Sequence, residues 1–442
     1  MIMLLRWSIL FSLLFYTQTY AQTRNTPPEI LHISYKATHL PDRITLCITD
    51  DPAHKAVVTW RTNNNHRNSR AEIAFSDPSP EFDEYESSVT ASSTNIETLE
   101  GIEAFHTVTF NNLEPSTNYV YRVGNDKYWS EWFQFKTAAN EPEPFGFIYL
   151  GDAQNKVFSH VSRVIRKAYA AKPDAAFILH AGDLVNHADN NYEWAEWYAT
   201  GSFIHSQIPV AAILGNHEYN KNKEGVKVSY SRFWNPQFEF PDNGPIDELR
   251  DHTYYFDYHN TRFVALNSND HIPAQAEWLE KTLSENTKKW TVVTFHHPAL
   301  STVKERQNIG VIEHWLPLLE KYKVDLVLQG HDHTYVRGTN MEQPANESGV
   351  INSPIYVISV AGEKMYELMD KDWMQRKGEN TQLYQLINIS KDKLSYHSYT
   401  IDDRIYDGFQ ITKNDSGIKT ISEIQPEVKE RRFTNTLADP DE

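Results

Sequence analysis

Cysteine is almost absent from the sequence: Cys47 is the only one among 442 residues. A single thiol cannot form a disulfide within the chain, and it cannot alone supply the ligands of a thiolate zinc site or an iron–sulfur cluster. The composition is otherwise that of a globular protein, with 40% hydrophobic and 23% charged residues. A chain of this length is expected to divide into roughly two or three domains, each with its own core.

Basic residues are also scarce relative to acidic ones. Lysine and arginine together number 42 against 59 aspartates and glutamates, which gives a formal net charge of −17. Phosphate backbones and anionic membranes are bound by clustered lysine and arginine side chains. The charge balance therefore argues against a nucleic-acid scaffold and against a surface that docks on anionic lipid.

Long apolar runs are confined to the start of the chain, where residues 7–16 follow Arg6 and precede Thr19-Tyr20-Ala21. Thr19 and Ala21 are small residues at the third and first positions before Gln22, which is typical of a signal peptidase site. We therefore expect a signal peptide over residues 1–21. A buried N-terminal helix is the alternative. The run is too short to anchor in a bilayer, and no second run approaches membrane length. We expect an exported protein, periplasmic or secreted, with no membrane span, and the lack of cysteine pairs fits bacterial export.

Residues 27–139 have the pattern of an all-β domain. Apolar and polar residues alternate over 56–62 and 106–110, with turn-rich stretches between such runs. Residues 113–123 read Leu-x-Pro-x-Thr-x-Tyr-x-Tyr-x-Val. This segment resembles the signature of fibronectin type III domains, in which a tyrosine forms a corner of a β-sandwich. We expect a fibronectin-like sandwich whose aromatic residues form its core and which carries no chemistry.

After a proline-containing linker at residues 138–144, apolar runs of strand length alternate with stretches of helical spacing, and residues 353–413 return to a β pattern. Strands that are apolar on both sides and separated by helices predict a sheet covered on both faces. The segment 414–442 is polar and charged, and we expect a loosely ordered tail there. The apolar runs are 145–150, 175–179, 208–214, 290–295, 324–328, 355–360 and 384–389.

Metal-competent side chains follow five of these runs, and a glycine precedes four of the five groups. Each group alone is usually a turn or a cap, but an ordered set of five is a specific signal. The carboxyl ends of strands in open α/β sheets converge on one crevice, so we expect these side chains to meet there. The groups are Asp152 and Gln154; Asp183, Asn186 and His187; Asn216, His217 and Glu218; His296 and His297; and His331 and His333.

These groups contain carboxylates, amide oxygens and imidazoles, and no sulfur. Such ligands suit Fe, Zn or Mn. One aspartate can bridge two ions through its two oxygens, and two ions about 3.5–4 Å apart can clamp the attacking and leaving oxygens of a phosphoryl transfer. The sequence therefore predicts a site for two metal ions.

The five groups resemble the five conserved blocks of the metallophosphoesterases, also called calcineurin-like phosphoesterases. The preceding β domain resembles the purple acid phosphatase branch. The resemblance implies a multidomain protein in which the sandwich precedes an α/β domain of four layers, α/β/β/α, with two mixed central sheets. It also implies that Asp183 bridges both metals, and that His217 is a catalytic histidine near the phosphate. The remaining metal ligands would be Asp152 and His333 at the first site, and Asn216, His296 and His331 at the second.

Two positions depart from the family pattern. Purple acid phosphatases have a tyrosine that binds ferric iron where this chain has Asn186, and other metallophosphoesterases have a histidine where it has Gln154. Asn186 or Gln154 could supply a weaker neutral oxygen, and we expect divalent ions to be favoured. Further candidates for substrate binding are His187, His297, Lys304 and Arg306, although a solvated loop around the last two is an equal alternative.

The resemblance implies an acid phosphatase-like hydrolase that cleaves phosphate monoesters of small phosphorylated substrates by in-line attack of a metal-held hydroxide. With the signal peptide expected over residues 1–21, this would be an exported enzyme. A phosphodiesterase using the same ions is one alternative. A binding or adhesion protein with a degenerate metal site is the other. The sequence leaves the oligomeric state open.

Overall fold

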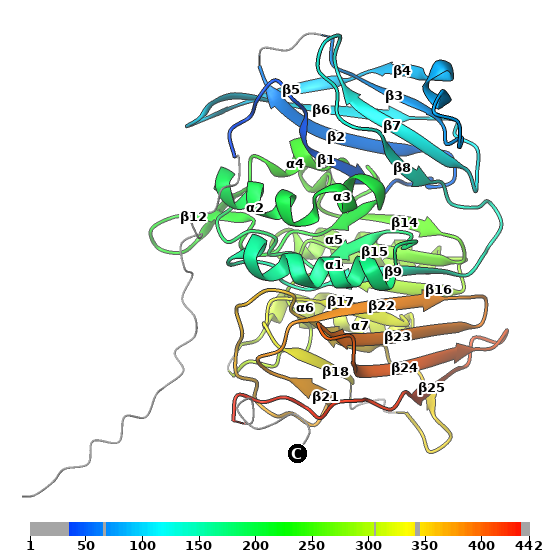
Figure 1. Cartoon of the computed structure of the whole chain (residues 1–442). Helices are drawn as coiled ribbons and strands as arrows, with labels where there is room; N and C mark the ends of the chain where they lie inside the picture. The colour runs from blue at the N-terminus through cyan, green and yellow to red at the C-terminus, as the bar shows by residue number, and fades with distance from the viewer. Residues whose placement is uncertain (1–34, 65–67, 305, 341–344, 435–442) are drawn as a thin grey trace, which may run out of the picture.

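The computed structural model describes residues 35–64, 68–304, 306–340 and 345–434. A β-sandwich made by the first part of the chain lies at one end, and two large sheets with helices on their outer faces form the rest (Figure 1). The predicted fold class, a β domain followed by a four-layer α/β domain, is confirmed. The proposed signal peptide, residues 1–21, lies outside the described residues. No helix among the described residues is long and apolar enough to cross a membrane.

The N-terminal sandwich consists of two four-stranded faces around an apolar core that contains Trp60, Tyr121 and Phe135. The Tyr119 hydroxyl accepts a hydrogen bond from the Glu114 N–H at 2.8 Å, which fixes the corner between the two faces. One face contains β1 (Asp42–Cys47), β2 (Ala56–Asn63), β5 (Ser92–Thr98) and β6 (Gly101–Phe110). The other contains β3 (Arg70–Phe75), β4 (Ser87–Thr90), β7 (Asn118–Gly124) and β8 (Phe133–Lys136).

The first central sheet continues directly from this sandwich. Strand β1 pairs in parallel with β11, with Cys47 opposite Val210, so the sandwich face and the first sheet of the α/β domain form one sheet of twelve strands. The sandwich is therefore not a separate module joined only by the linker. The strands of this sheet in the α/β domain are β9 (Phe145–Leu150), β10 (Ile178–His180), β11 (Val210–Ala212), β19 (Val350–Ile351), β22 (Leu383–Ile389), β23 (Lys393–Thr400), β24 (Ile405–Lys413) and β25 (Lys419–Glu423).

The second central sheet has seven strands in the order β14-β15-β16-β17-β20-β18-β21. Strands β15, β16, β17 and β20 are parallel, as are β9, β10 and β11 in the first sheet. The bounds are β14 (Tyr254–Tyr258), β15 (Thr261–Ala265), β16 (Trp290–Thr294), β17 (Leu326–Gln329), β18 (Tyr335–Thr339), β20 (Ile355–Ile358) and β21 (Met374–Gly378).

Helices cover the outer faces of both sheets. Helix α1 buries Val164, Ile165 and Ala168 against the first sheet, as the helical spacing over 161–168 predicted. The first sheet is covered by α1 (Ser162–Ala171), α2 (Asn191–Gly201) and α3 (Phe203–Gln207), and the second by α5 (Ile272–Ser284), α6 (Ile309–His314) and α7 (Leu316–Lys321). Shorter elements are α4 (Trp234–Gln237), a π turn over Val157–Val161, and 3-10 turns over Phe82–Tyr85 and Asp247–Leu249.

The second sheet is apolar on both faces because each face packs on a different layer. Phe263 and Ala265 of β15 belong to the core shared with the first sheet, whereas Val264 and the adjacent Leu266 belong to the core under α5–α7. Successive strand residues point to opposite faces, so a continuous apolar run is what two packed faces require. The same pattern in the other central strands makes the α/β/β/α layering readable from sequence.

The expectation of a loosely ordered tail after residue 413 is wrong for the described part of that segment. Strand β25 pairs with β24 and with β19 at the edge of the first sheet. The Lys419 ammonium is buried and donates to the carbonyls of Lys323 and Val324, both at 3.0 Å. A polar sequence is ordered here because an open sheet edge and buried carbonyl groups offer its backbone and its lysine partners.

Candidate metal centre

The predicted ligands leave their strands at carboxyl ends that meet at one place. Asp152 follows β9, Asp183 follows β10 and Asn216 follows β11, all in the first sheet. His296 follows β16, and the His331 segment follows β17, both in the second sheet. The site therefore lies where the carboxyl ends of parallel strands from two facing sheets converge. In each sheet taken alone, the carboxyl ends of the strands are the expected place for a site.

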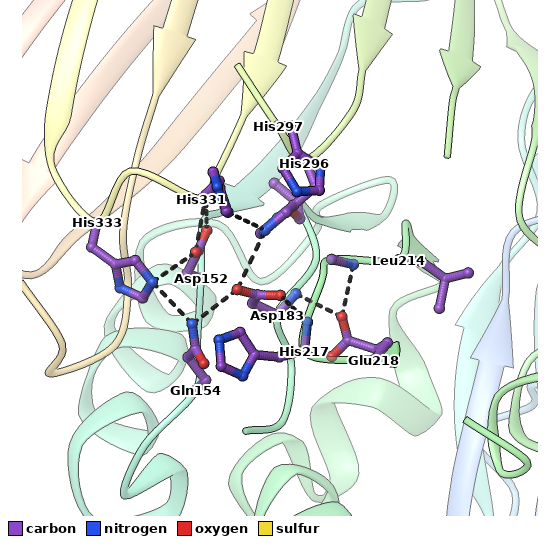
Figure 2. Close-up of polar contacts among 12 residues, drawn as sticks. Asp152, Gln154, Asp183, Leu214, His217, Glu218, His296, His297, His331 and His333 are labelled. Atoms are coloured by element: carbon purple, nitrogen blue, oxygen red, sulfur yellow. Dashed lines mark hydrogen bonds and ion pairs between the residues drawn. The ribbon is translucent and has the colours of Figure 1, made fainter. Parts of the chain in front are cut away.

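Asp183 belongs to two groups of potential metal ligands. One group contains Asp183, His296 and His331, and the other contains Asp152, Asp183 and His333. Within each group the ligand atoms all lie within 4.8 Å of one another. Asp183 Oδ2 is 3.3 Å from His296 Nε2, and Asp152 Oδ2 is 3.2 Å from His333 Nε2. The shared carboxylate is thus placed to bridge two ions (Figure 2).

Two histidines are held in a defined tautomer by backbone carbonyl groups. His296 Nδ1 donates to the Ala181 carbonyl at 2.8 Å, and His333 Nδ1 donates to the Lys364 carbonyl at 2.8 Å. Each ring therefore directs its Nε2 toward the carboxylates. This arrangement is typical of metal-binding histidines, because the carbonyl fixes the ring orientation and makes the free nitrogen more basic.

The electrostatics of the cluster favour bound cations. Burial raises the pKa of Asp152 to about 7, and the neighbouring Asp183 carboxylate reinforces the shift. Burial would also raise the pKa of Asp183, but positive charge on His296 and His217 outweighs it and holds that pKa well below its usual range. Burial lowers the pKa of His333 well below its usual value, so this imidazole is neutral and its lone pair is available. Burial would lower the pKa of His296, but the Asp183 and Asp152 carboxylates raise it to about 9. The buried carboxylates thus attract positive charge, which a bound cation can supply in place of that proton.

A buried amide oxygen provides an independent test of metal fit. Asn216 is 8% exposed, and its Oδ1 has no hydrogen-bond partner among the described residues. An unpaired buried carbonyl oxygen is unfavourable unless a cation satisfies it. Together with the carboxylates and imidazoles, this oxygen completes a donor set without sulfur, which suits Fe, Zn or Mn. The residues present therefore fit a centre of two metal ions.

The site is built on backbone conformations that are rare for residues with side chains. Asp183, His331 and His333 have φ values of +51°, +72° and +47°, in the left-handed region. A Cβ at Gly215 would lie 2.1 Å from Asp183 Oδ1, and one at Gly330 would lie 2.1 Å from Asp152 Oδ1. Glycine is required at both positions because the carboxylates pass against the backbone there. Strain of this kind is typical of functional sites.

The two residues that depart from the family pattern are placed differently. Gln154 is fully buried in the cluster, and its Nε2 lies 2.9 Å from both Asp183 Oδ2 and His333 Nε2. The Asn186 amide is buried and contacts His187 Nδ1 at 3.4 Å, and its backbone carbonyl accepts a hydrogen bond from His217. Of the two, Gln154 is the one in direct contact with the proposed metal ligands.

His217 and Glu218 connect the loops of the site. The His217 N–H donates to Asp183 Oδ1 at 2.9 Å, and its Nδ1 donates to the Asn186 carbonyl at 2.7 Å. The buried Glu218 carboxylate accepts hydrogen bonds from the N–H groups of Asp183 at 2.8 Å and Gly215 at 2.7 Å, and also from Leu184. Sequence reasoning gave Glu218 no role. Its position directly after the Asn-His pair was the available signal.

The candidates for substrate binding separate into two groups. His297 Nδ1 contacts the Ser268 hydroxyl at 2.8 Å, and its ring centroid lies 4.3 Å from that of His331, so it adjoins the centre. His187 has an exposed side chain and pairs with Glu193 at 2.6 Å. The structure does not bring the other two together at the centre: Lys304 has an exposed side chain, and Arg306 pairs with the buried Asp332 at 2.8 Å behind His331.

Two known families match the chain. The family described as "Calcineurin-like phosphoesterase" matches residues 145–335, which hold every predicted metal ligand. The chain therefore contains a calcineurin-like phosphoesterase domain. This is a family of metal-dependent hydrolases. Residues 41–137 match the "Purple acid Phosphatase, N-terminal domain", as the resemblance of the β domain to that branch predicted. The resemblance of this part to fibronectin type III stays a prediction.

Relatives of this chain are about a quarter identical to it over the matched residues. An uncharacterised protein of Mycobacterium tuberculosis (strain H37Rv) is 27% identical over 317 residues, which cover 64% of this chain and 59% of that protein. The Fe(3+)-Zn(2+) purple acid phosphatase 12 of Arabidopsis thaliana is 27% identical over 54% of this chain and 53% of that protein. The chain thus spans between about half and three fifths of the length of these relatives.

A solved structure shares the fold of this chain over nearly its whole length. The purple acid phosphatase PPD1 from yellow lupin (Lupinus luteus) seeds superposes with a TM-score of 0.70, covering 91% of this chain and 76% of that one. The sequence identity in that superposition is 18%, so the likeness concerns the fold.

Proposed function

We propose that this protein is an exported phosphatase that hydrolyses phosphate monoesters at a centre of two metal ions. The observation that carries the proposal is the position of Asp183, a fully buried carboxylate shared by two ligand groups of carboxylates and imidazoles. A donor set built around a shared aspartate supports two ions close enough to act on one phosphoryl group.

The predicted ligands divide between two ions that share Asp183. Asp152 and His333, with Gln154 beside them, would hold one ion, and Asn216, His296 and His331 would hold the other. When bound, such ions supply water activation and stabilise the negative charge that develops on phosphoryl oxygens. The carbonyl partners of His296 and His333 keep the imidazole lone pairs directed inward, and Glu218 fixes the loop that carries Asp183.

His217 acts on the substrate rather than on the metals in this proposal. Its Nδ1 is engaged with the Asn186 carbonyl, so only Nε2 is available to the substrate. From the cluster edge beside Asp183 (Figure 2), Nε2 donates a hydrogen bond to a phosphoryl oxygen or a proton to the leaving group. A small phosphorylated substrate fits this role. The neutral amides at positions 154 and 186 favour divalent ions over ferric iron.

Export rests on the sequence of residues 1–21. A mature protein that begins at Gln22 when it is isolated from the periplasm or the culture medium is the expected result. Mass spectrometry of the intact N-terminus measures it directly. A protein that keeps residues 1–21 and stays with the cell contents would contradict export without affecting the catalytic proposal.

Turnover assays with defined metals test the proposed reaction. The wild-type protein, stripped of metal and reloaded with Zn, Mn or Fe, is expected to hydrolyse p-nitrophenyl phosphate faster than bis(p-nitrophenyl) phosphate. Faster hydrolysis of the diester would make the protein a phosphodiesterase. No metal-dependent turnover of either ester, in a protein that binds two ions, would favour a binding protein instead.

A further inference from the structure

A short hairpin next to the metal centre carries an unusual pair of lysines. Strands β12 (Tyr219–Lys221) and β13 (Lys227–Tyr230) follow directly after the Asn216-His217-Glu218 segment, and they pair with Lys221 opposite Lys227. Residues paired across antiparallel strands share a face, so the two ammonium groups lie on one side of the hairpin. Val226 and Val228 are 58% and 62% exposed.

Lys227 is held close to the loop that carries the predicted metal ligand Asn216. Its Nζ donates to Asn269 Oδ1 at 2.6 Å and lies 5.5 Å from the centroid of the Tyr219 ring. Asn269 Nδ2 in turn donates to the Gly215 carbonyl at 3.3 Å, directly before Asn216. Asn269 therefore links Lys227 to the loop that carries Asn216. Among the described residues, Lys227 forms no hydrogen bond or ion pair with a predicted metal ligand.

The two lysines carry like charges at paired positions of the hairpin. Neither Lys221 nor Lys227 forms an ion pair with a carboxylate of the described residues. Like charges opposite one another in a two-stranded ribbon repel. Burial, and then Lys221, lower the pKa of Lys227 to about 8, whereas Asp183 and Asp270 act against this shift. The charge of Lys227 also acts on His297, which adjoins the centre.

An anion bound between these ammonium groups would remove the repulsion. The chain as a whole carries a net charge of −17, so a local positive site is unexpected unless it serves a ligand. Lysine binds phosphate or carboxylate groups as a point charge, with strong charge-assisted hydrogen bonds. The hairpin stands beside the metal centre, so the natural anion is part of the substrate.

We propose that Lys227, together with Lys221, binds a second anionic group of the substrate, a phosphate or a carboxylate, next to the phosphate that is hydrolysed. The inference rests on the proposed phosphatase function and names its substrate class: phosphoesters or phosphoanhydrides with two anionic groups. The scissile phosphate is surrounded by the metals and His217, whereas Lys227 lies outside this set beyond Asn269. Its position thus selects the substrate group beyond the scissile phosphate.

Paired substrates that differ only in the second anion test the proposal. AMP and ADP differ by one phosphate, and glycerol 3-phosphate and 3-phosphoglycerate differ by one carboxylate. In the metal-loaded protein, Lys227→Gln is expected to lower kcat/KM for the substrate with the second anion at least about tenfold more than for its partner, mainly through KM. The phosphate and carboxylate pairs show which anion is preferred. Lys227→Arg, which keeps the charge, should retain most of the preference.

The matched control is Lys223→Gln, which removes the same charge from the exposed tip of the same hairpin. It should leave all four kcat/KM values within about twofold of wild type. An equal loss on both members of each pair in Lys227→Gln, or no loss at all, would overturn the proposal. If the wild type hydrolyses none of the four compounds, the phosphatase function fails. Calorimetric binding then decides the lysine's role: weaker binding of ADP but not AMP in Lys227→Gln supports it, and unchanged binding overturns it.

Discussion

His217 Nδ1 donates a hydrogen bond of 2.7 Å to the backbone carbonyl of Asn186. The bond joins two of the loops that form the metal centre, and it makes the position of the proposed catalytic imidazole depend on the loop that follows Asp183. That loop is held from behind by α2. Glu193 in the first turn of α2 is 3% exposed and accepts hydrogen bonds from the N–H groups of Asn186 at 2.8 Å and His187 at 2.6 Å.

Glu193→Gln is therefore expected to reduce kcat by about tenfold or more while leaving bound metal near its wild-type content. The carboxylate accepts both N–H groups at Oε2, and at Oε1 it accepts the side-chain NH2 of Asn190 at 3.0 Å. The amide has only one acceptor oxygen, so its own NH2 opposes donors on one side, and the Asn186 carbonyl shifts relative to His217. Steady-state kinetics and metal analysis measure the two effects. Glu277→Gln, on the exposed face of α5, is the matched control. Loss of metal in step with activity would show that Glu193 supports the fold of the centre instead.

The sandwich also reaches this loop through a buried network. Arg43 Nη2 donates to the Asn191 carbonyl at 2.9 Å, and Arg61 Nη1 donates to Asn191 Oδ1 at 3.2 Å. Asn191 is the first residue of α2, two positions before Glu193. The N-terminal domain therefore supports the helix that positions the Asn186 loop, although the domain contributes no predicted metal ligand.

A chain that begins at residue 140 is expected to aggregate. In the full chain, the Ile48 N–H next to β1 donates to the Val210 carbonyl of β11 at 3.0 Å, and the Tyr121 hydroxyl donates to the Ser206 carbonyl at 2.6 Å. The truncation removes both bonds and leaves β11 as an open edge of the sheet. Open, apolar edge strands associate with other chains. Size-exclusion chromatography compares it with a chain that begins at residue 35. A monodisperse, active protein without the sandwich would show that the continuous sheet is dispensable.

Acid is expected to destabilise the protein through two buried histidines. The rings of His180 and His205 lie 5.4 Å apart beside Trp197. Burial lowers the pKa of His180 to about 3, and burial together with His180 lowers that of His205 well below its usual value. The unfolded chain binds these protons near pH 6.5, but the folded chain does not. Stability is therefore complete above about pH 6.5 and falls toward pH 3, by up to about 1.4 kcal/mol per pH unit for each histidine.

Urea unfolding at pH 7.5 and pH 5.5 measures this dependence. The free energy of unfolding should fall less between the two values in His205→Gln than in the wild type. His314→Gln, at an exposed position of α6, is the control and should keep the wild-type difference. An unchanged pH dependence in His205→Gln would mean that this histidine does not take up a proton on unfolding.

The isolated protein is expected to be colourless and active with divalent ions. The purple colour of the family arises from a tyrosinate bound to ferric iron, and this chain has Asn186 at the position of that tyrosine. A visible spectrum with metal analysis measures this, and Asn186→Tyr is the variant that should increase affinity for ferric iron. A strong visible band in the wild type would mean that another phenol binds iron. Tyr366, whose ring centroid lies 4.7 Å from that of His333, would then be the residue to replace.

The convergence of the predicted ligands could be inferred from sequence for a simple physical reason. Asp152 and Asp183 follow neighbouring parallel strands, and strands of that kind bring their carboxyl ends to one edge. The roles of Glu193 and Lys227 could not be inferred in this way. Glu193 had a local signal, since it stands three residues after the N-cap Asn190, but its hydrogen bonds to the Asn186 loop depend on the tertiary fold. Lys227 is defined by its contact with Asn269, which is distant in sequence.

The continuity of the twelve-stranded sheet was also beyond sequence reasoning. Cys47 and Val210 pair across a separation of many residues, and strand partners at such distances carry no local sequence signal. The prediction of a loosely ordered tail over residues 414–442 is wrong for the described part for the same reason. A polar segment such as 419–423 is ordered by the sheet edge it joins, and local composition does not contain that information.

The exchange of Asp183 for asparagine tests the central claim most directly, because both ligand groups depend on this one carboxylate. The measurement is metal content per chain together with turnover of p-nitrophenyl phosphate, in the wild type and in Asp183→Asn, with circular dichroism to show that the variant is folded. We predict two ions per chain and metal-dependent turnover in the wild type, and one ion or fewer with at least about a thousandfold loss of kcat in the variant. A folded Asp183→Asn protein that keeps both ions and near-normal turnover would contradict the account of a bridged centre.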